Sequence, residues 1–151
     1  MNNDQFFMNK AYQQALKAYH YDEVPIGAVI INEHGVIIAQ GYNQSEKRCT
    51  QVAHAEMNVL VKAAKKIKNW RLEKTTLYVT VQPCLMCLGA LYLSRVSRIV
   101  YGIPSIKFGI SIDQGIQIGI YKNLRTKIEC MEYKPAKDLL QLFFQKKRSI
   151  Y

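Results

Sequence analysis

The fold is set by residues 76–102, which read TLYVTVQPCLMCLGALYLSRVSRIVYG. Residues 76–81 have the composition of a strand, which Pro83 ends. The segment 84–93 is too rich in Leu and Ala to form another strand, so Pro83 stands at the entrance of a helix. Residues 98–102 then read as a short strand. This alternation of strand, helix and strand predicts a parallel crossover in an α/β fold.

Upstream, the sequence predicts one helix and a pair of strands. A helix capped by Asp4 and extending to about His20 follows from apolar residues that recur every four positions. These residues are Phe7, Ala11, Ala15 and Tyr19. Residues 26–31 and 36–39 are β-branched stretches joined by the turn-rich residues 32–35, which predicts an antiparallel hairpin.

Two further amphipathic helices are predicted, one beginning at His54 and one at Pro135. The first has separate apolar and basic faces, so we expect it to pack on a sheet. Its apolar face comprises Met57, Leu60, Val61, Ala64 and Ile67, and its basic face comprises Lys62, Lys65 and Lys66. The second has apolar residues at Ala136, Leu139, Leu140 and Phe143. Residues 103–127 follow no single period, so the sequence predicts no element there.

The composition indicates a single domain over residues 1–151, with 49% hydrophobic and 21% charged residues. The chain does not begin with a secretory signal, and no apolar run reaches the length of a membrane span. We therefore expect a cytoplasmic protein without a membrane partner. Its four cysteines are better interpreted as thiols or metal ligands than as disulfides.

The net charge is strongly positive: the chain has 21 Lys and Arg residues but only 11 Asp and Glu residues, which gives a formal net charge of +10. Such a charge is typical of proteins that bind polyanions, although a merely basic surface is the alternative. The clustering of the basic residues along the sequence favours polyanion binding. The clusters are Lys62, Lys65, Lys66, Lys68, Arg71 and Lys74 in the middle of the chain, and Lys146, Lys147 and Arg148 near its end.

Two helix openings carry the chemistry, His54-Ala55-Glu56 and Pro83-Cys84-Leu85-Met86-Cys87. The spacing of Cys84 and Cys87 places both sulfurs on one side of a helical turn. A helix N-terminus also favours the thiolate form that binds zinc. With His54 as a third ligand, the fourth position of one Zn²⁺ stays open for water, as in catalytic zinc sites.

A hydrolytic reaction needs a proton carrier beside that water. Zinc lowers the pKa of bound water from about 15.7 towards roughly 7, so hydroxide becomes available near neutral pH. Glu56 lies close to His54 but is not required as a ligand. We expect it to take the proton of the water, deliver a proton to a ring nitrogen and help the amine leave as ammonia.

Two other interpretations of the cysteines stay open. Cys49 and Cys130 could complete a closed structural site, although neither belongs to a second Cys-x-x-Cys pair. Cys84 and Cys87 could instead form a redox pair, which would leave His54-Ala55-Glu56 without a role.

The two openings match the known H-x-E and P-C-x-x-C signature of zinc deaminases. Beyond it, the chain resembles the bacterial tRNA adenosine deaminases over almost its whole length. The matching segments are VPIGAV (24–29), GYN (41–43), AHAE (53–56), TLYVT (76–80), PCLMC (83–87), GAL (89–91), SR (94–95), VYG (100–102) and FF (143–144), followed by the basic tail.

This resemblance implies a cytidine deaminase-like three-layer α/β/α fold with a central mixed five-stranded sheet. It implies a homodimer that converts the wobble adenosine of a tRNA anticodon to inosine with one Zn²⁺ per chain. It also implies that Asn43, Ala55 and Pro83 contact the target nucleotide. The residues that it places near the RNA of the anticodon stem-loop are Lys107, Lys146, Lys147 and Arg148. On the residues alone, Asn43 reads as a turn residue and the tail as a solvated helix end.

Three places depart from the family pattern. Thr50-Gln51-Val52 replaces Asp-Pro-Thr, Gln82 replaces a Glu before Pro-Cys, and Ser105 stands in the region where an Asp commonly faces the RNA. The three metal ligands are intact, so these changes bear on substrate choice.

Three functions fit these observations. The first is tRNA adenosine deamination, which the positive charge favours. The second is the same reaction on a free nucleobase or nucleoside of the guanine or cytosine type, whose turnover should depend little on salt. The third is a non-enzymatic RNA-binding module with a structural zinc, for which Glu56→Gln should change nothing.

Overall fold

The computed structural model describes residues 3–105 and 125–150, and its centre is a five-stranded sheet of order β2-β1-β3-β4-β5. The strands are β1 (Gly27–Ile31), β2 (Ile37–Tyr42), β3 (Thr76–Val81), β4 (Arg98–Ile103) and β5 (Lys127–Cys130). β1 is antiparallel to β2 and β3, whereas β3, β4 and β5 run parallel. The expected mixed five-stranded sheet is confirmed.

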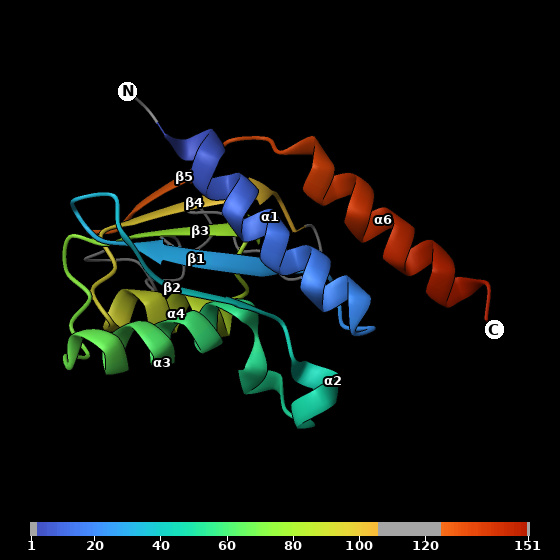
Figure 1. Ribbon diagram of the computed structural model, residues 1–151, viewed down its shortest axis with the longest axis horizontal. Coiled ribbons are helices and arrows are strands. Elements are labelled where there is room, and N and C mark those ends of the chain that lie inside the picture. Colours follow the sequence, from blue (N-terminus) through green and yellow to red (C-terminus); the bar gives the residue numbers. More distant parts are fainter. Residues whose placement is uncertain (1–2, 106–124, 151) are drawn as a thin grey trace.

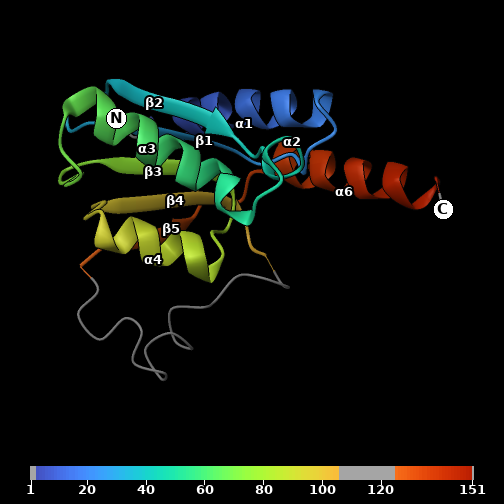
Figure 2. The ribbon, with the colours of Figure 1, turned by 90° about the horizontal axis from the view of Figure 1, so that it is seen from below.

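Helices cover both faces of this sheet (Figures 1 and 2). α1 (Asp4–His20) and α6 (Lys134–Arg148) lie on one face, and α3 (Ala55–Ile67) and α4 (Leu85–Leu93) lie on the other. The short helix α2 (Ser45–Arg48) and a 3-10 turn at Gln51–Ala53 connect β2 to α3. The expected three-layer α/β/α arrangement is confirmed.

The core has two parts because strand side chains alternate between the faces of the sheet. Ala28 and Ile30 of β1 pack in the cluster under α3 and α4, whereas Val29 and Ile31 pack in the cluster under α1 and α6. All five residues of β1 are buried, as expected for a strand covered on both faces.

The strand–helix–strand prediction from residues 76–102 is confirmed. β3 and β4 pair in parallel, with Leu77 beside Ile99, and α4 connects them. Cys84 occupies the N-cap of α4, so Pro83 directly precedes the helix. The hairpin is confirmed too, since Asn32 Oδ1 accepts hydrogen bonds from the backbone N–H groups of His34 and Val36 in its turn.

Two sequence predictions about helices were wrong. Asn3 occupies the N-cap of α1, and Asp4 lies in its first turn. The Asp4 carboxylate accepts hydrogen bonds from the Tyr78 hydroxyl (2.6 Å) and the Arg98 guanidinium (2.7 and 2.8 Å). These charge-assisted bonds beneath the helix hold the carboxylate away from the capping position.

The apolar face predicted for α3 was wrong in part, since Leu60 and Met57 pack in the core as expected but two other residues do not. Val61 and Ile67 are 52% and 41% exposed, whereas the sheet is met by Val59, Leu60 and Ala63. Ala63 is fully buried, and its small side chain lets the helix lie close to the sheet. The sequence offers apolar residues on either side of Leu60, with Val59 and Ala63 on one side and Val61 and Ala64 on the other, and contact with the sheet selects Val59 and Ala63.

β5 was not foreseen from the residue pattern. At the edge of the sheet its two end residues are exposed and its two middle residues are half-buried, and only Ile128 and Cys130 are apolar, so the apolar signal of the strand is weak. Of the unpatterned segment 103–127, residues 106–124 lie outside the described part of the chain. Within the described residues, no helix is long and apolar enough to cross a membrane.

Candidate metal centre and active site

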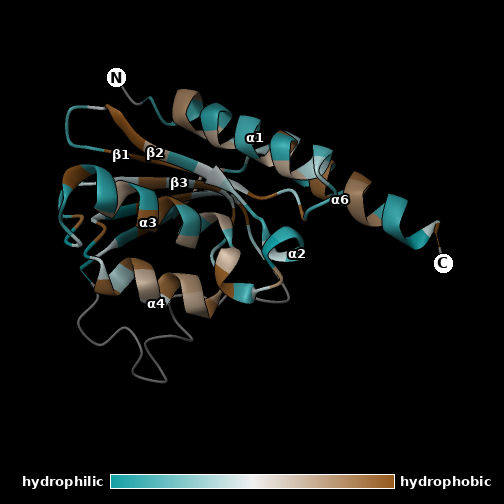
Figure 3. Cartoon of the chain, turned by 60° about the horizontal axis from the view of Figure 1, so that its bottom comes forward, coloured by the Kyte–Doolittle hydropathy of each residue, from teal (hydrophilic) through white to brown (hydrophobic). Residues whose placement is uncertain are grey.

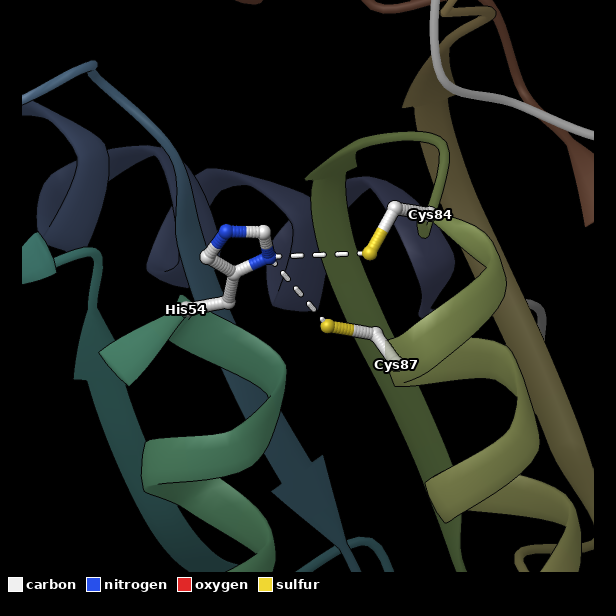
Figure 4. A group of neighbouring side chains, drawn as sticks. All are labelled: His54, Cys84 and Cys87. Carbon is white, nitrogen blue, oxygen red and sulfur yellow. Dashed lines mark hydrogen bonds between the residues drawn. The ribbon is translucent and has the colours of Figure 1, made fainter. Parts of the chain in front are cut away.

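The N-terminal ends of α3 and α4 bring three ligand-type side chains together. His54 is the N-cap of α3, Cys84 is the N-cap of α4, and Cys87 lies one turn further along α4. Figure 4 shows the imidazole of His54 facing both sulfurs across the space between the two helices. Residues 30 and 33 positions apart in the sequence thus converge on one point.

The spacing of these atoms suits a tetrahedral ion. His54 Nδ1 lies 3.6 Å from Cys84 Sγ and 3.5 Å from Cys87 Sγ. An ion bound at about 2.05 Å from nitrogen and about 2.3 Å from sulfur, with tetrahedral angles, separates those ligand atoms by about 3.6 Å. The three residues therefore fit one Zn²⁺ per chain and leave a fourth position open.

Gln51 determines which nitrogen of His54 faces the sulfurs. The ring Nε2 lies 3.2 Å from Gln51 Oε1. When Nδ1 ligates a metal it carries no proton, so Nε2 bears the hydrogen and donates it to that oxygen. Gln51 lies in the segment that departs from the family pattern, and the sequence alone did not suggest this role.

The sulfurs hold negative charge. A hydrogen bond from Cys87 lowers the pKa of the Cys84 thiol to about 4, and the contact with His54 lowers it further. Hydrogen bonding to Cys84 and burial raise the pKa of Cys87, and the hydrogen bond with Cys84 raises the pKa of His54. The pair of thiols thus shares one proton, which a bound dication would displace.

Glu56 lies in the first turn of α3 and is 4% exposed. Burial raises the pKa of its carboxyl group to about 7, and the negative Cys84 sulfur adds to the effect. A carboxyl group in this range binds and releases a proton near neutral pH, which a proton carrier requires. A bound dication would lower this pKa again because it favours the carboxylate.

Two buried polar side chains hold the loop that presents Gln51 and His54. Asn58 donates hydrogen bonds to the carbonyl oxygens of Tyr42 (2.8 Å) and Ala53 (3.0 Å). Its own oxygen accepts from Arg48 (2.9 Å). The carboxylate of Glu23 accepts from the backbone N–H groups of Glu46 (3.0 Å) and Lys47 (2.7 Å) in α2. Sequence reasoning missed both residues, because each lies just outside a segment that matches the family and has partners that are distant in the sequence.

The residues predicted to contact substrate lie in varied surroundings. Asn43 is 5% exposed; its oxygen accepts from Ser45 Oγ (2.7 Å), and its amide donates to the Val24 carbonyl (3.3 Å). Ala55 and Pro83 are buried beside the ligands that they neighbour. Lys147 pairs with Asp22 at 2.5 Å near the end of α6. Lys107 lies outside the described residues.

Cys49 and Cys130 are exposed. Among the described residues, the group of ligand atoms within 4.8 Å of one another comprises His54, Cys84 and Cys87 alone. A closed site with four cysteines is therefore wrong, and the histidine beside the thiols disfavours a simple redox pair.

The family model of the cytidine and deoxycytidylate deaminase zinc-binding region matches residues 1–103. The chain belongs to this deaminase family. Among its relatives, the tRNA-specific adenosine deaminase of Bacillus subtilis is 47% identical over 111 residues, which cover 74% of this chain and 68% of that protein.

Two solved structures extend the comparison of this deaminase. One comes from a study of tRNA:A34 deaminases in A-to-I editing at the wobble position, with 32% identity and a TM-score of 0.74; the match covers 83% of this chain and 97% of that one. The other is a guanine deaminase of Bacillus subtilis, with 31% identity and a TM-score of 0.64, covering 81% and 76%. Both share the fold of this deaminase.

Proposed function

We propose that this deaminase hydrolyses the wobble adenosine of a tRNA anticodon to inosine, releasing ammonia. The observation that carries the proposal is the convergence of His54, Cys84 and Cys87 beside the buried carboxyl group of Glu56. The 47% identity with a tRNA-specific adenosine deaminase supports the choice of substrate over a free base.

The chain supplies three ligands and a proton carrier. His54 Nδ1 and the two thiolates would hold the zinc, with Gln51 orienting the imidazole. Zinc, when bound, makes water acidic enough to provide hydroxide near neutral pH. Glu56 takes the proton of this water and passes it to a ring nitrogen of the base. It then takes the proton of the hydroxyl group that has added to the ring carbon and delivers it to the amine, which leaves as ammonia while the carbonyl of inosine forms.

The substrate contacts belong to the same proposal. Ala55 opens α3 and Pro83 precedes α4, so both stand next to metal ligands, where the target base must enter. Asn43 follows the strand that leads to α2, and its amide would have to exchange its present partners to reach a nucleotide. We assign RNA contacts to Lys107, Lys146, Lys147 and Arg148, the last three in the final turn of α6. A cytoplasmic location stays a prediction.

We further propose that two copies associate through α4. This helix is apolar on all sides (Figure 3), yet Leu85, Met86 and Leu93 are 43%, 36% and 71% exposed. An apolar helix in a folded protein is ordinarily covered. Light scattering should report a dimer for the wild type and a monomer for Leu93→Glu. A wild type that is monomeric at micromolar concentrations would contradict this interface.

The function is tested by mass spectrometry of products. The zinc-loaded protein is incubated with a panel of anticodon stem-loops carrying adenosine at the wobble position, and separately with guanine, cytosine and their nucleosides. We expect inosine from at least one stem-loop and no conversion of the free bases. Conversion of a free base alone would replace the tRNA substrate while leaving the zinc chemistry in place.

A further inference from the structure

A second basic surface lies on the layer formed by α3 and α4, at the end opposite the three candidate metal ligands. Residues 65–71, which read KKIKNWR, are all exposed. They form the C-terminal end of α3 and the turn beyond it, and Arg95 follows the end of α4 beside them. We call this the basic end surface, comprising Lys65, Lys66, Lys68, Trp70, Arg71 and Arg95.

Trp70 organises the two arginines of this surface. The residue is 53% exposed, and the guanidinium carbons of Arg71 and Arg95 lie 4.2 Å and 5.5 Å from the centroid of its ring. Such cation–π contacts restrict the arginine side chains before any ligand arrives. Guanidinium groups held in place bind phosphate oxygens through two hydrogen bonds at once.

Most of this charge is available to a ligand. Within residues 3–105 and 125–150, no ion pair joins Lys65, Lys66, Lys68 or Arg71 to a carboxylate, whereas Arg95 pairs with Glu73 at 2.7 Å. The dipole of α3 accounts for lysines in its last turn. It does not account for Arg71, which lies beyond the C-cap of the helix at Lys68.

We propose that the basic end surface binds the phosphate backbone of the tRNA substrate outside its anticodon stem-loop. The proposal rests on the proposed function, because it takes the same RNA as substrate. α3 has 13 residues, and at about 1.5 Å per residue it separates this surface from His54 by about 20 Å. A nucleotide in the active site cannot reach so far, so the surface contacts a different part of the RNA.

The test compares full-length tRNA with the isolated anticodon stem-loop. The triple variant Lys65→Ala, Lys68→Ala, Arg71→Ala removes three charges from exposed positions, so folding should persist. We expect the KM for full-length tRNA to rise about 10-fold or more with kcat unchanged, and the KM for the stem-loop to stay within about twofold. The slope of log affinity against log salt for tRNA should become shallower by about 0.7 to 0.9 for each phosphate that the variant no longer neutralises.

The matched control removes the same charge from the opposite layer of the molecule, through Lys10→Ala, Lys17→Ala and Lys137→Ala. Equal effects of the two triple variants, or an unchanged KM for full-length tRNA, would overturn the proposal. A rise in the KM for the stem-loop as large as that for full-length tRNA would overturn the placement outside the anticodon stem-loop. Equilibrium binding of tRNA is measured in parallel. If the wild-type protein formed no inosine, the proposed function would fail, whereas the binding data would still test the basic end surface.

Discussion

The orientation of a single imidazole ring governs the metal centre at the scale of residues. Gln51 Oε1, 3.2 Å from His54 Nε2, leaves Nδ1 to bind a metal. Partners of this kind hold a ligand in one tautomer and one rotamer. We expect Gln51→Leu to weaken zinc affinity by about 10- to 100-fold, measured by competition with a chromogenic chelator.

The conservative variant Gln51→Glu keeps an acceptor oxygen and should retain most of the affinity, which a general loosening of the loop would not explain. Equal zinc affinity in wild type and Gln51→Leu would show that this hydrogen bond does not position the ligand.

Glu56 allows a separate test of chemistry and binding. The variant Glu56→Gln has nearly the same shape but cannot carry a proton. We expect kcat to fall by about 10²- to 10⁴-fold, while zinc content stays at one per chain and RNA affinity changes little. Inosine formation, elemental analysis and filter binding measure the three quantities. Unchanged turnover would favour a module whose zinc is merely structural.

At the scale of elements, α1 packs on β1 at Gly27. A Cβ atom at this position would stand 2.1 Å from the Ala11 carbonyl oxygen and 2.3 Å from the Ala15 nitrogen, both in the α1 backbone. Gly27→Ala therefore forces the helix away from the sheet. We expect the free energy of unfolding to fall by about 3 kcal/mol, measured by urea titration.

The matched control is Gly89→Ala inside α4, where a Cβ atom would meet nothing within 4 Å. This change should stabilise the helix by roughly 0.5 to 1 kcal/mol. Similar losses in the two variants would mean that close packing at Gly27 is not the cause.

Arg98 joins three elements through its charge. It binds Asp4 of α1 (2.7 Å) and Glu129 of β5 (2.5 Å), and its side chain is 27% exposed. Arg98→Met removes the cation that the Asp4 carboxylate binds, so we expect a loss of about 3 kcal/mol at pH 7, measured by urea titration.

This loss should depend on pH through Glu129. Hydrogen bonds from Lys127 and Arg98 lower the pKa of Glu129 below its ordinary value of 4.5. A lowered pKa means that the carboxylate stabilises the fold above pH 4.5 and loses this effect as the pH falls through its folded pKa. The gap between wild type and Arg98→Met should therefore shrink in acid. A constant gap from about pH 7 to about pH 3 would show that Glu129 does not contribute.

At the scale of the whole molecule, the formal charge of +10 should strengthen the binding of RNA. If about four phosphates are neutralised, tRNA affinity should fall about 100-fold between about 50 and 200 mM salt. The chemical step should change little, because the proton carrier is buried. Single-turnover rates over a salt series separate the effect on RNA binding from the effect on the chemical step. A KM that does not change with salt concentration would refute the interpretation that the charge binds a polyanion.

The motif-bearing elements were predictable because their signals are local. The crossover from β3 through α4 to β4, and the helix openings with His54 and Cys84, follow from composition and spacing within short windows. Gln51, Asn58 and Glu23 could not be found this way, since their partners are set by how the loop before α3 folds back. The edge strand β5 was not predicted for a related reason, because its pairing with β4 is a contact between distant segments.

The sequence alone determined the types of metal ligand, the order of most strands and helices, and the strong positive charge. Each of these is a property of neighbouring residues or of the composition of the whole chain. Three other features emerged only from the folded arrangement: the two helix openings meet, α3 turns Val59 and Ala63 to the sheet, and Asp4 binds Arg98 instead of capping α1. Those outcomes depend on packing between segments far apart in the chain, where many arrangements satisfy the local pattern and burial selects one.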